Sequence, residues 1–70
     1  MFNEHLKKIR KSKGFTQKQV AAAIGITERN YQLYEAGSQK PSFDALIALA
    51  DYFDVSIDYL VGRSDDPRRL

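Results

Sequence analysis

The sequence of 70 residues has no cysteine and no tryptophan, and His5 is its single histidine. Without cysteine, neither disulfide bonds nor a cysteine-based zinc site can support so short a chain. One histidine is also too few for a zinc site, so we expect no metal and no cofactor. No apolar run approaches the roughly 18 residues that span a bilayer, and no signal-peptide pattern opens the chain. We therefore expect a cytoplasmic protein without a membrane partner.

Strand signals are also scarce, because β-branched residues are few and no stretch alternates between apolar and polar residues. Helical spacing of apolar residues recurs instead, and the hydrophobic content of 43% is enough for a packed core. A chain of this length allows one domain. We predict an all-α fold, a compact five-helix bundle in residues 1–62, followed by a polar C-terminal tail in residues 63–70 that frays.

Charges of opposite sign gather in different parts of the chain, although the net charge is only +2. Residues 1–20 carry six basic side chains and one acidic one, a net charge of +5. Residues 41–62 carry four aspartates and no basic residue, a net charge of −4. The basic segment fits contact with a nucleic acid, but a solvated basic helix fits it equally. Three of the aspartates, Asp51, Asp54 and Asp58, have the spacing of a solvated acidic face rather than of a metal site.

Apolar spacing predicts five helices, with these sets of apolar residues: Phe2, Leu6 and Ile9; Val20, Ala21 and Ile24; Tyr31 and Tyr34; Phe43, Leu46, Ile47, Leu49, Ala50 and Phe53; Ile57, Leu60 and Val61. The second and third sets are expected on the inner faces of their helices. Four hydroxyl side chains have the positions of N-caps for the last four helices, namely Thr16, Thr27, Ser42 and Ser56. Thr16 and Gln19 also have the spacing of a capping box. Gly14 ends the first helix, and Gly25 ends the second in a left-handed or otherwise open conformation.

The turn around Gly25 joins two short helices that are close in sequence. Such a turn is typical of a helix-turn-helix unit, whose helices cross at about 90–120°. A sharp crossing needs a small residue at the contact, and Ala21 supplies one. A plain antiparallel helix pair with an alanine-rich contact fits the same spacing, so the turn alone leaves both interpretations open.

The outward face of the third helix has an unusual composition for a solvated surface. With Tyr31 and Tyr34 inward, a rotation of about 100° per residue turns five residues outward: Glu28, Arg29, Gln32, Leu33 and Ala36. In a major groove, Arg29 could bind guanine, Gln32 adenine and Glu28 a cytosine amine, while Leu33 could meet a thymine methyl group. The alternative is a surface pair of Glu28 and Gln32 beside an incidental exposed leucine.

The ordered set of these residues resembles the repressor- and Cro-type helix-turn-helix family of bacteria and their phages, the XRE family. The resemblance extends over residues 2–62 without a gap and includes a Leu/Ile-rich fourth helix. Its main carriers are Thr16-Gln17, Ala21, Gly25-Ile26, Tyr31, Tyr34-Glu35, Gly37 and Pro41-Ser42. It implies a five-helix bundle that binds a specific sequence in double-stranded DNA, as a homodimer in most members.

The resemblance also implies roles for single residues. Contacts to bases or the nearby backbone are expected from the start and outer face of the third helix, at Thr27, Glu28, Arg29, Gln32 and Leu33. Phosphate contacts are expected at helix N-termini and in the loop before the fourth helix, at Gln17, Lys18, Ser38, Lys40 and Phe43. Arg10 and Glu35 are expected to form a structural ion pair, although two unrelated surface charges remain the alternative.

Two residue types depart from the common pattern of the family. Tyr31 and Tyr34 are aromatic where aliphatic residues are frequent, so their hydroxyl groups must reach water or a partner. Leu33 replaces a polar side chain that often reads bases. A dimer surface is predicted at Ile57, Leu60 and Val61, unless these residues close the core.

The sequence therefore predicts a DNA-binding transcriptional regulator, more specifically a repressor. The alternative is a helical protein-interaction module or an antitoxin, which acts mainly through a protein partner. We expect no enzymatic activity, because no set of serine, histidine and aspartate can be assembled around a pocket and no glycine-rich phosphate loop is present.

Overall fold

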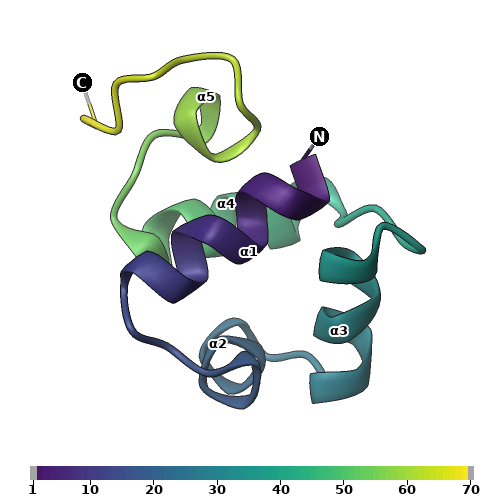
Figure 1. The fold of residues 1–70 in the computed structure, drawn as a ribbon. Helices are drawn as coiled ribbons and strands as arrows, with labels where there is room; N and C mark the ends of the chain where they lie inside the picture. The colour runs from purple at the N-terminus through teal and green to yellow at the C-terminus, as the bar shows by residue number, and fades with distance from the viewer. Residues whose placement is uncertain (1, 70) are drawn as a thin grey trace.

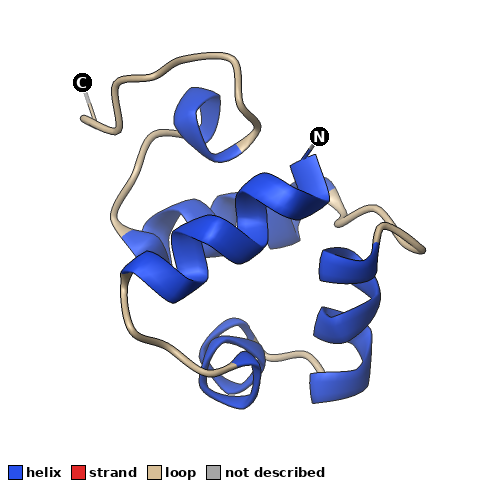
Figure 2. Cartoon of the chain, viewed as in Figure 1, coloured by secondary structure: helices blue, strands red, loops and turns tan. Residues whose placement is uncertain are grey.

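The computed structural model describes residues 2–69; Met1 and Leu70, the outer ends of the predicted domain and tail, lie outside this range. The helices are α1 (Phe2–Ser12), α2 (Gln17–Ile24), α3 (Glu28–Ala36), α4 (Phe43–Phe53) and α5 (Ile57–Leu60). No strand occurs in residues 2–69 (Figure 2). The predicted all-α bundle of five helices is therefore confirmed. None of these helices is long and apolar enough to cross a membrane.

The helices are arranged in two groups around a central pair. In Figure 1, α1 and α4 run through the middle of the molecule, α2 and α3 lie on one side of them, and α5 lies on the opposite side. α3 packs against both α1 and α2, and α5 packs against α1 and α4. The basic α1 and the acidic α4 thus both lie in the middle of the bundle, with the helix-turn-helix pair on one side of them and α5 on the other (Figure 1).

Side-chain caps define where the helices begin. The hydroxyl groups of Thr16, Thr27, Ser42 and Ser56 each accept a hydrogen bond from the backbone N–H three residues later. Gln19 completes a capping box, because its side chain accepts from the backbone N–H of Thr16 at 2.8 Å. The four caps agree with the sequence prediction. Each hydroxyl oxygen accepts from a backbone N–H that has no partner within the first turn of its helix.

The core contains most of the apolar residues whose spacing predicted the helices. Its fully or almost fully buried apolar side chains are Leu6, Ile9, Val20, Ala21, Tyr31, Tyr34, Ala45, Leu49, Ala50, Phe53, Val55 and Leu60. Phe43 belongs to the apolar set of α4 but not to this core, because its side chain is 73% exposed. Phe43 lies two turns before the buried Ala50, at the first position of α4, where the bundle covers little of its side chain.

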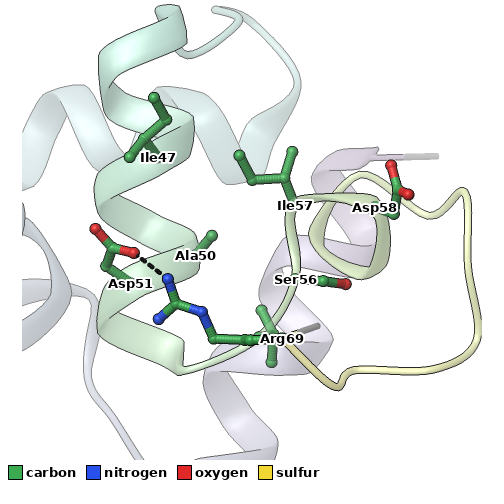
Figure 3. Close-up of a pocket in the computed structure, with 8 residues that line it drawn as sticks. Ile47, Ala50, Asp51, Ser56, Ile57, Asp58 and Arg69 are labelled. Carbon is green, nitrogen blue, oxygen red and sulfur yellow. Dashed lines mark hydrogen bonds and ion pairs between the residues drawn. The ribbon is translucent and has the colours of Figure 1, made fainter.

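Residues 63–69 fold back onto α4 and α5 instead of fraying. The carbonyl oxygen of Pro67 accepts a hydrogen bond from the backbone N–H of Ser56 at 3.0 Å. Figure 3 shows Arg69 reaching Asp51 on α4, where Nη2 and Oδ1 are 2.5 Å apart. A second oxygen, from Asp54, lies 3.7 Å from Nη1 of Arg69. The polar composition that predicted a loose tail also supplies these contacts.

α5 is tied to α1 through the single histidine. The Nε2 atom of His5 lies 2.6 Å from the carbonyl oxygen of Tyr59, in hydrogen-bonding distance. The rings of His5 and Tyr59 also meet edge to face, with their centroids 5.2 Å apart. His5 therefore has a structural role between two helices.

Candidate nucleic-acid interface

α2 and α3 form a compact helix-turn-helix unit. Gly25 ends α2 in the left-handed region, with φ of 77°, as the sequence predicted. The backbone N–H of Ile26 then donates to the carbonyl oxygen of Ala21 at 3.0 Å, which closes the turn. Ala21 is almost fully buried, and α2 packs against both α3 and α4, so a larger side chain at this position would disturb the packing of α2.

Two tyrosines set the rotation of α3 about its axis. Tyr31 and Tyr34 are buried, and their rings pack edge to face with centroids 6.2 Å apart. Because both lie on the inner face, the residues on the other side of α3 are turned away from the core. The prediction that these aromatic residues anchor the helix inward is confirmed.

The candidate base-reading side chains lie on the free side of α3. Glu28, Arg29 and Gln32 are exposed, as is Thr27 at the N-cap. Thr27 accepts a hydrogen bond from the N–H of Asn30 at 3.0 Å, and its own hydroxyl hydrogen remains available for donation. Leu33 is half-buried, so it presents less apolar surface than the sequence suggested.

The candidate phosphate-binding residues gather near two helix N-termini. Lys18, Ser38, Lys40 and Phe43 are exposed, and Gln17 is half-buried. Gln17 and Lys18 occupy the first turn of α2, whereas Phe43 opens α4 directly after the loop. Backbone N–H groups in a first helical turn have no partner within the helix and carry the positive end of its dipole. Both helix ends can therefore bind an anion.

A buried polar cluster lies behind this surface, where α1, α2 and α3 meet. The carboxylate of Glu35 accepts from Nε and Nη2 of Arg10, at 2.7 and 3.1 Å. It also accepts from the Tyr31 hydroxyl at 2.5 Å and from Nε2 of Gln17 at 3.0 Å. The side chains of Arg10 and Glu35 are only 10% and 3% exposed. Arg10 and Glu35 thus form the expected ion pair, and the hydroxyl of Tyr31 has a partner.

The cluster changes the proton affinity of its members. Burial alone would raise the pKa of Glu35, but the hydrogen bonds from Arg10, Tyr31 and Gln17 lower it below its ordinary value. The hydrogen bond to Glu35 raises the pKa of Arg10. Burial and the neighbouring carboxylate together raise the pKa of the Tyr31 hydroxyl. Glu35 is therefore charged and Tyr31 is neutral at ordinary pH.

The residues predicted for a dimer surface differ in their exposure. Ile57 is 40% exposed, and Val61 is half-buried. Leu60 is fully buried in the core, so it closes the subunit and is not available to a second copy. Ile57 lines a shallow groove between α4 and α5 together with Ile47 and Arg69 (Figure 3).

One feature of this region had no sequence signal. Gln17 and Glu35 are 18 positions apart on different helices, and no local spacing links them. Their hydrogen bond depends on how α2 and α3 pack against each other.

Comparison with known proteins agrees with this geometry. A family model described as "Helix-turn-helix" matches residues 6–60. YobD, an uncharacterized HTH-type transcriptional regulator of Bacillus subtilis, is 45% identical over 67 residues, which are 96% of this chain and 60% of YobD. RstR, a cryptic phage CTXphi transcriptional repressor from Vibrio cholerae, is 42% identical over 60 residues, which are 86% of this chain and 54% of RstR.

The fold is shared with a solved structure as well. The crystal structure of a transcriptional regulator from Listeria innocua superposes with a TM-score of 0.83 at 36% identity, covering 94% of this chain and 62% of that one. The chain thus spans less than two thirds of the length of each of these three relatives. Because this family match extends over residues 6–60, from the middle of α1 to the end of α5, the chain belongs to the helix-turn-helix family.

Proposed function

We propose that this protein is a transcriptional regulator, specifically a repressor, that binds a specific sequence in double-stranded DNA. The proposal rests mainly on one observation: the start of α3 presents Glu28, Arg29 and Gln32 on a free surface, while Tyr31 and Tyr34 hold the opposite face in the core. An α-helix fits the major groove, and side chains near its N-terminus reach the bases in helix-turn-helix complexes.

The chemistry of the exposed side chains assigns a role to each. Arg29 has the bidentate fork that matches the O6 and N7 atoms of guanine, and Gln32 can pair with adenine. Glu28 accepts from the amine of cytosine, and Leu33 offers its exposed part to a thymine methyl group. Thr27 can donate its hydroxyl hydrogen to a base or to the adjoining backbone.

Phosphate contacts would fix the position of α3 in the groove. The N-terminus of α2, with Gln17 and Lys18, would hold one phosphate. The loop at Ser38 and Lys40, with the N-terminus of α4 at Phe43, would hold another. The net charge of +5 in residues 1–20 favours approach to the polyanion.

Two copies would bind neighbouring half-sites on one face of the DNA. In helix-turn-helix dimers, the two recognition helices are about 34 Å apart, one turn of the duplex. Ile57 and Val61 remain as the dimer surface, since Leu60 is buried. A repressor fits the similarity to RstR, a phage transcriptional repressor, and a regulator of transcription would act in the cytoplasm.

The proposal can be tested by selecting bound duplexes from a random library. Binding to the most enriched sequence is then titrated and compared with binding to a scrambled duplex. We expect saturable binding to the selected sequence at low salt. The logarithm of the binding constant should fall linearly with that of the salt concentration, with a slope set by the number of phosphates neutralised. The absence of saturable binding to any duplex at low salt would reject the proposal. Sedimentation of the complex would show whether two copies are bound.

A further inference from the structure

The side chain of Gln17 belongs to the candidate DNA surface, yet it is hydrogen-bonded to the buried cluster beneath that surface. Gln17 is the first residue of α2, and its Nε2 atom donates to Oε1 of Glu35 at 3.0 Å. A glutamine amide nitrogen carries two hydrogens. One is taken by Glu35, and no second acceptor for this group is found within residues 2–69.

Glu35 is itself fixed by the groups around it. Besides Gln17, its carboxylate accepts three hydrogen bonds, two from Arg10 and one from the Tyr31 hydroxyl. Its side chain is 3% exposed, so it has no room to turn away. The charge of Arg10 compensates that of Glu35, which limits the repulsion that a bare carboxylate would exert on a nearby phosphate.

We infer that Glu35 is a positioning residue for DNA binding: it holds the Gln17 amide so that its remaining N–H donates to a backbone phosphate. This inference rests on the proposed function. A free glutamine at a helix start would lose conformational entropy when DNA orders it. Here the ordering takes place during folding, and the contact forms without that loss.

The same link joins the phosphate contact to the recognition helix. Gln17 lies at the start of α2, and Glu35 lies in the last turn of α3. A phosphate bound by Gln17 is therefore connected through two hydrogen bonds to the helix that enters the groove. This arrangement holds the backbone contact and the base-reading face in a fixed relative position.

The decisive experiment compares the effect of Gln17→Ala in two backgrounds. The first is the native chain. The second carries Arg10→Met, Tyr31→Phe and Glu35→Leu, because replacement of a whole buried ion pair by apolar residues preserves folding in other proteins. The dissociation constant for the selected duplex is measured by fluorescence anisotropy, and circular dichroism verifies the fold of each variant.

We expect Gln17→Ala to weaken binding about tenfold in the native chain, the effect of one charge-assisted hydrogen bond. In the apolar background the loss should be less than about twofold, since an unheld glutamine contributes little. Lys40→Ala is the matched control, and it should cost the same in both backgrounds. An equal cost of Gln17→Ala in both backgrounds would overturn the inference.

A second variant covers the case in which the apolar background does not fold. Gln17→Asn retains the amide, but it is one methylene too short to reach Glu35 and a phosphate together. We expect it to lose nearly as much affinity as Gln17→Ala, with the stability of the native fold largely kept. Affinity close to that of the native chain would contradict positioning by Glu35.

An observation without DNA separates this inference from the proposed function. In the NMR spectrum of the free protein, one of the two Gln17 side-chain N–H protons should be shifted downfield and protected from exchange. Two rapidly exchanging, unshifted protons would overturn the positioning role even if the protein binds DNA. Failure of the native chain to bind any duplex would reject the proposed function and this inference together, whatever the spectrum shows.

Discussion

The two sides of the bundle are held together by different kinds of ion pair. Where α1, α2 and α3 meet, the Arg10–Glu35 pair is buried, with side chains 10% and 3% exposed. On the side of α5, Arg69 pairs with Asp51 and Asp54, and the side chains involved are between 45% and 85% exposed. Both pairs join segments that are distant in sequence, so burial is the main difference between them.

This difference indicates where the molecule needs a fixed geometry. A buried pair is costly to break because the remaining charge has no partner and no water, whereas an exposed pair adds little to stability. The buried pair lies behind the surface proposed to bind DNA. The exposed pair only holds the returning C-terminal segment. The following predictions test this contrast, from the largest expected effect to the smallest.

Removal of the central carboxylate should have the largest effect. Glu35→Ala leaves Arg10 buried and unpaired, so we expect a loss of about 3–5 kcal/mol in the free energy of unfolding. That is a large part of the 5–15 kcal/mol typical of small domains. Urea denaturation followed by circular dichroism measures the loss. A change below about 1 kcal/mol would show that the cluster is no more important than a surface pair.

Acid should weaken the same cluster by a smaller amount, because a protonated Glu35 keeps part of its hydrogen bonding. The pKa of Glu35 is lowered in the folded protein. The contribution of the Glu35 carboxylate to the free energy of unfolding is therefore complete above the unfolded pKa of about 4.3. It is lost as the pH falls through the lower pKa of the folded protein. Thermal unfolding across this pH range should show a decline in Tm for the native chain. The apolar Arg10→Met, Tyr31→Phe, Glu35→Leu variant should lack this decline. Parallel curves for the two proteins would assign the decline to other carboxylates.

The hydroxyl of Tyr31 should make a further measurable contribution. Tyr31→Phe removes one donor to the charged Glu35 and leaves the ring packing in place, so we expect a loss of about 1.5–3 kcal/mol in the free energy of unfolding. Tyr34→Phe is a suitable control, since no hydrogen bond from its hydroxyl to the cluster is found in residues 2–69. If both variants lose the same stability, the bond from Tyr31 to Glu35 is unimportant.

The cluster also shows how far the sequence alone could be interpreted. Caps such as Thr16 and Ser42 were predicted because they depend on neighbours within three residues. The inward face of α3 was predicted because Tyr31 and Tyr34 follow a helical period. The tie between Gln17 and Glu35 joins separate helices, and it depends on a packing angle that no local pattern specifies.

The errors in the sequence analysis have the same origin. Leu60 was predicted on a dimer surface, yet the packing of α5 leaves it fully buried in the core. Residues 63–69 looked like a loose tail because their composition is polar, but Arg69 finds acidic partners on another helix. The predicted base and phosphate contacts remain predictions, since they concern a complex with DNA.

On the DNA surface, base contacts and phosphate contacts should respond differently to truncation. Arg29→Ala should remove about 1–3 kcal/mol of discrimination at one base pair and leave binding to scrambled duplexes nearly unchanged. Lys40→Ala should weaken binding to all sequences alike and reduce the salt slope by about 1. Titration of both variants against single-base substitutions in the selected duplex measures these effects. Equal behaviour of the two variants would contradict the proposed division of roles.

The smallest effect is expected on the other side of the bundle. Arg69→Ala removes the two exposed ion pairs that join the C-terminal segment to Asp51 and Asp54, and such pairs contribute about 0–1 kcal/mol because water and salt screen them. The free energy of unfolding should therefore change by less than about 1 kcal/mol, and the small change should shrink further as salt is added. DNA affinity should stay the same, since the segment lies with α5 rather than with α2 and α3 (Figure 1). A loss comparable to that of Glu35→Ala would mean that this side of the bundle is held as firmly as the other.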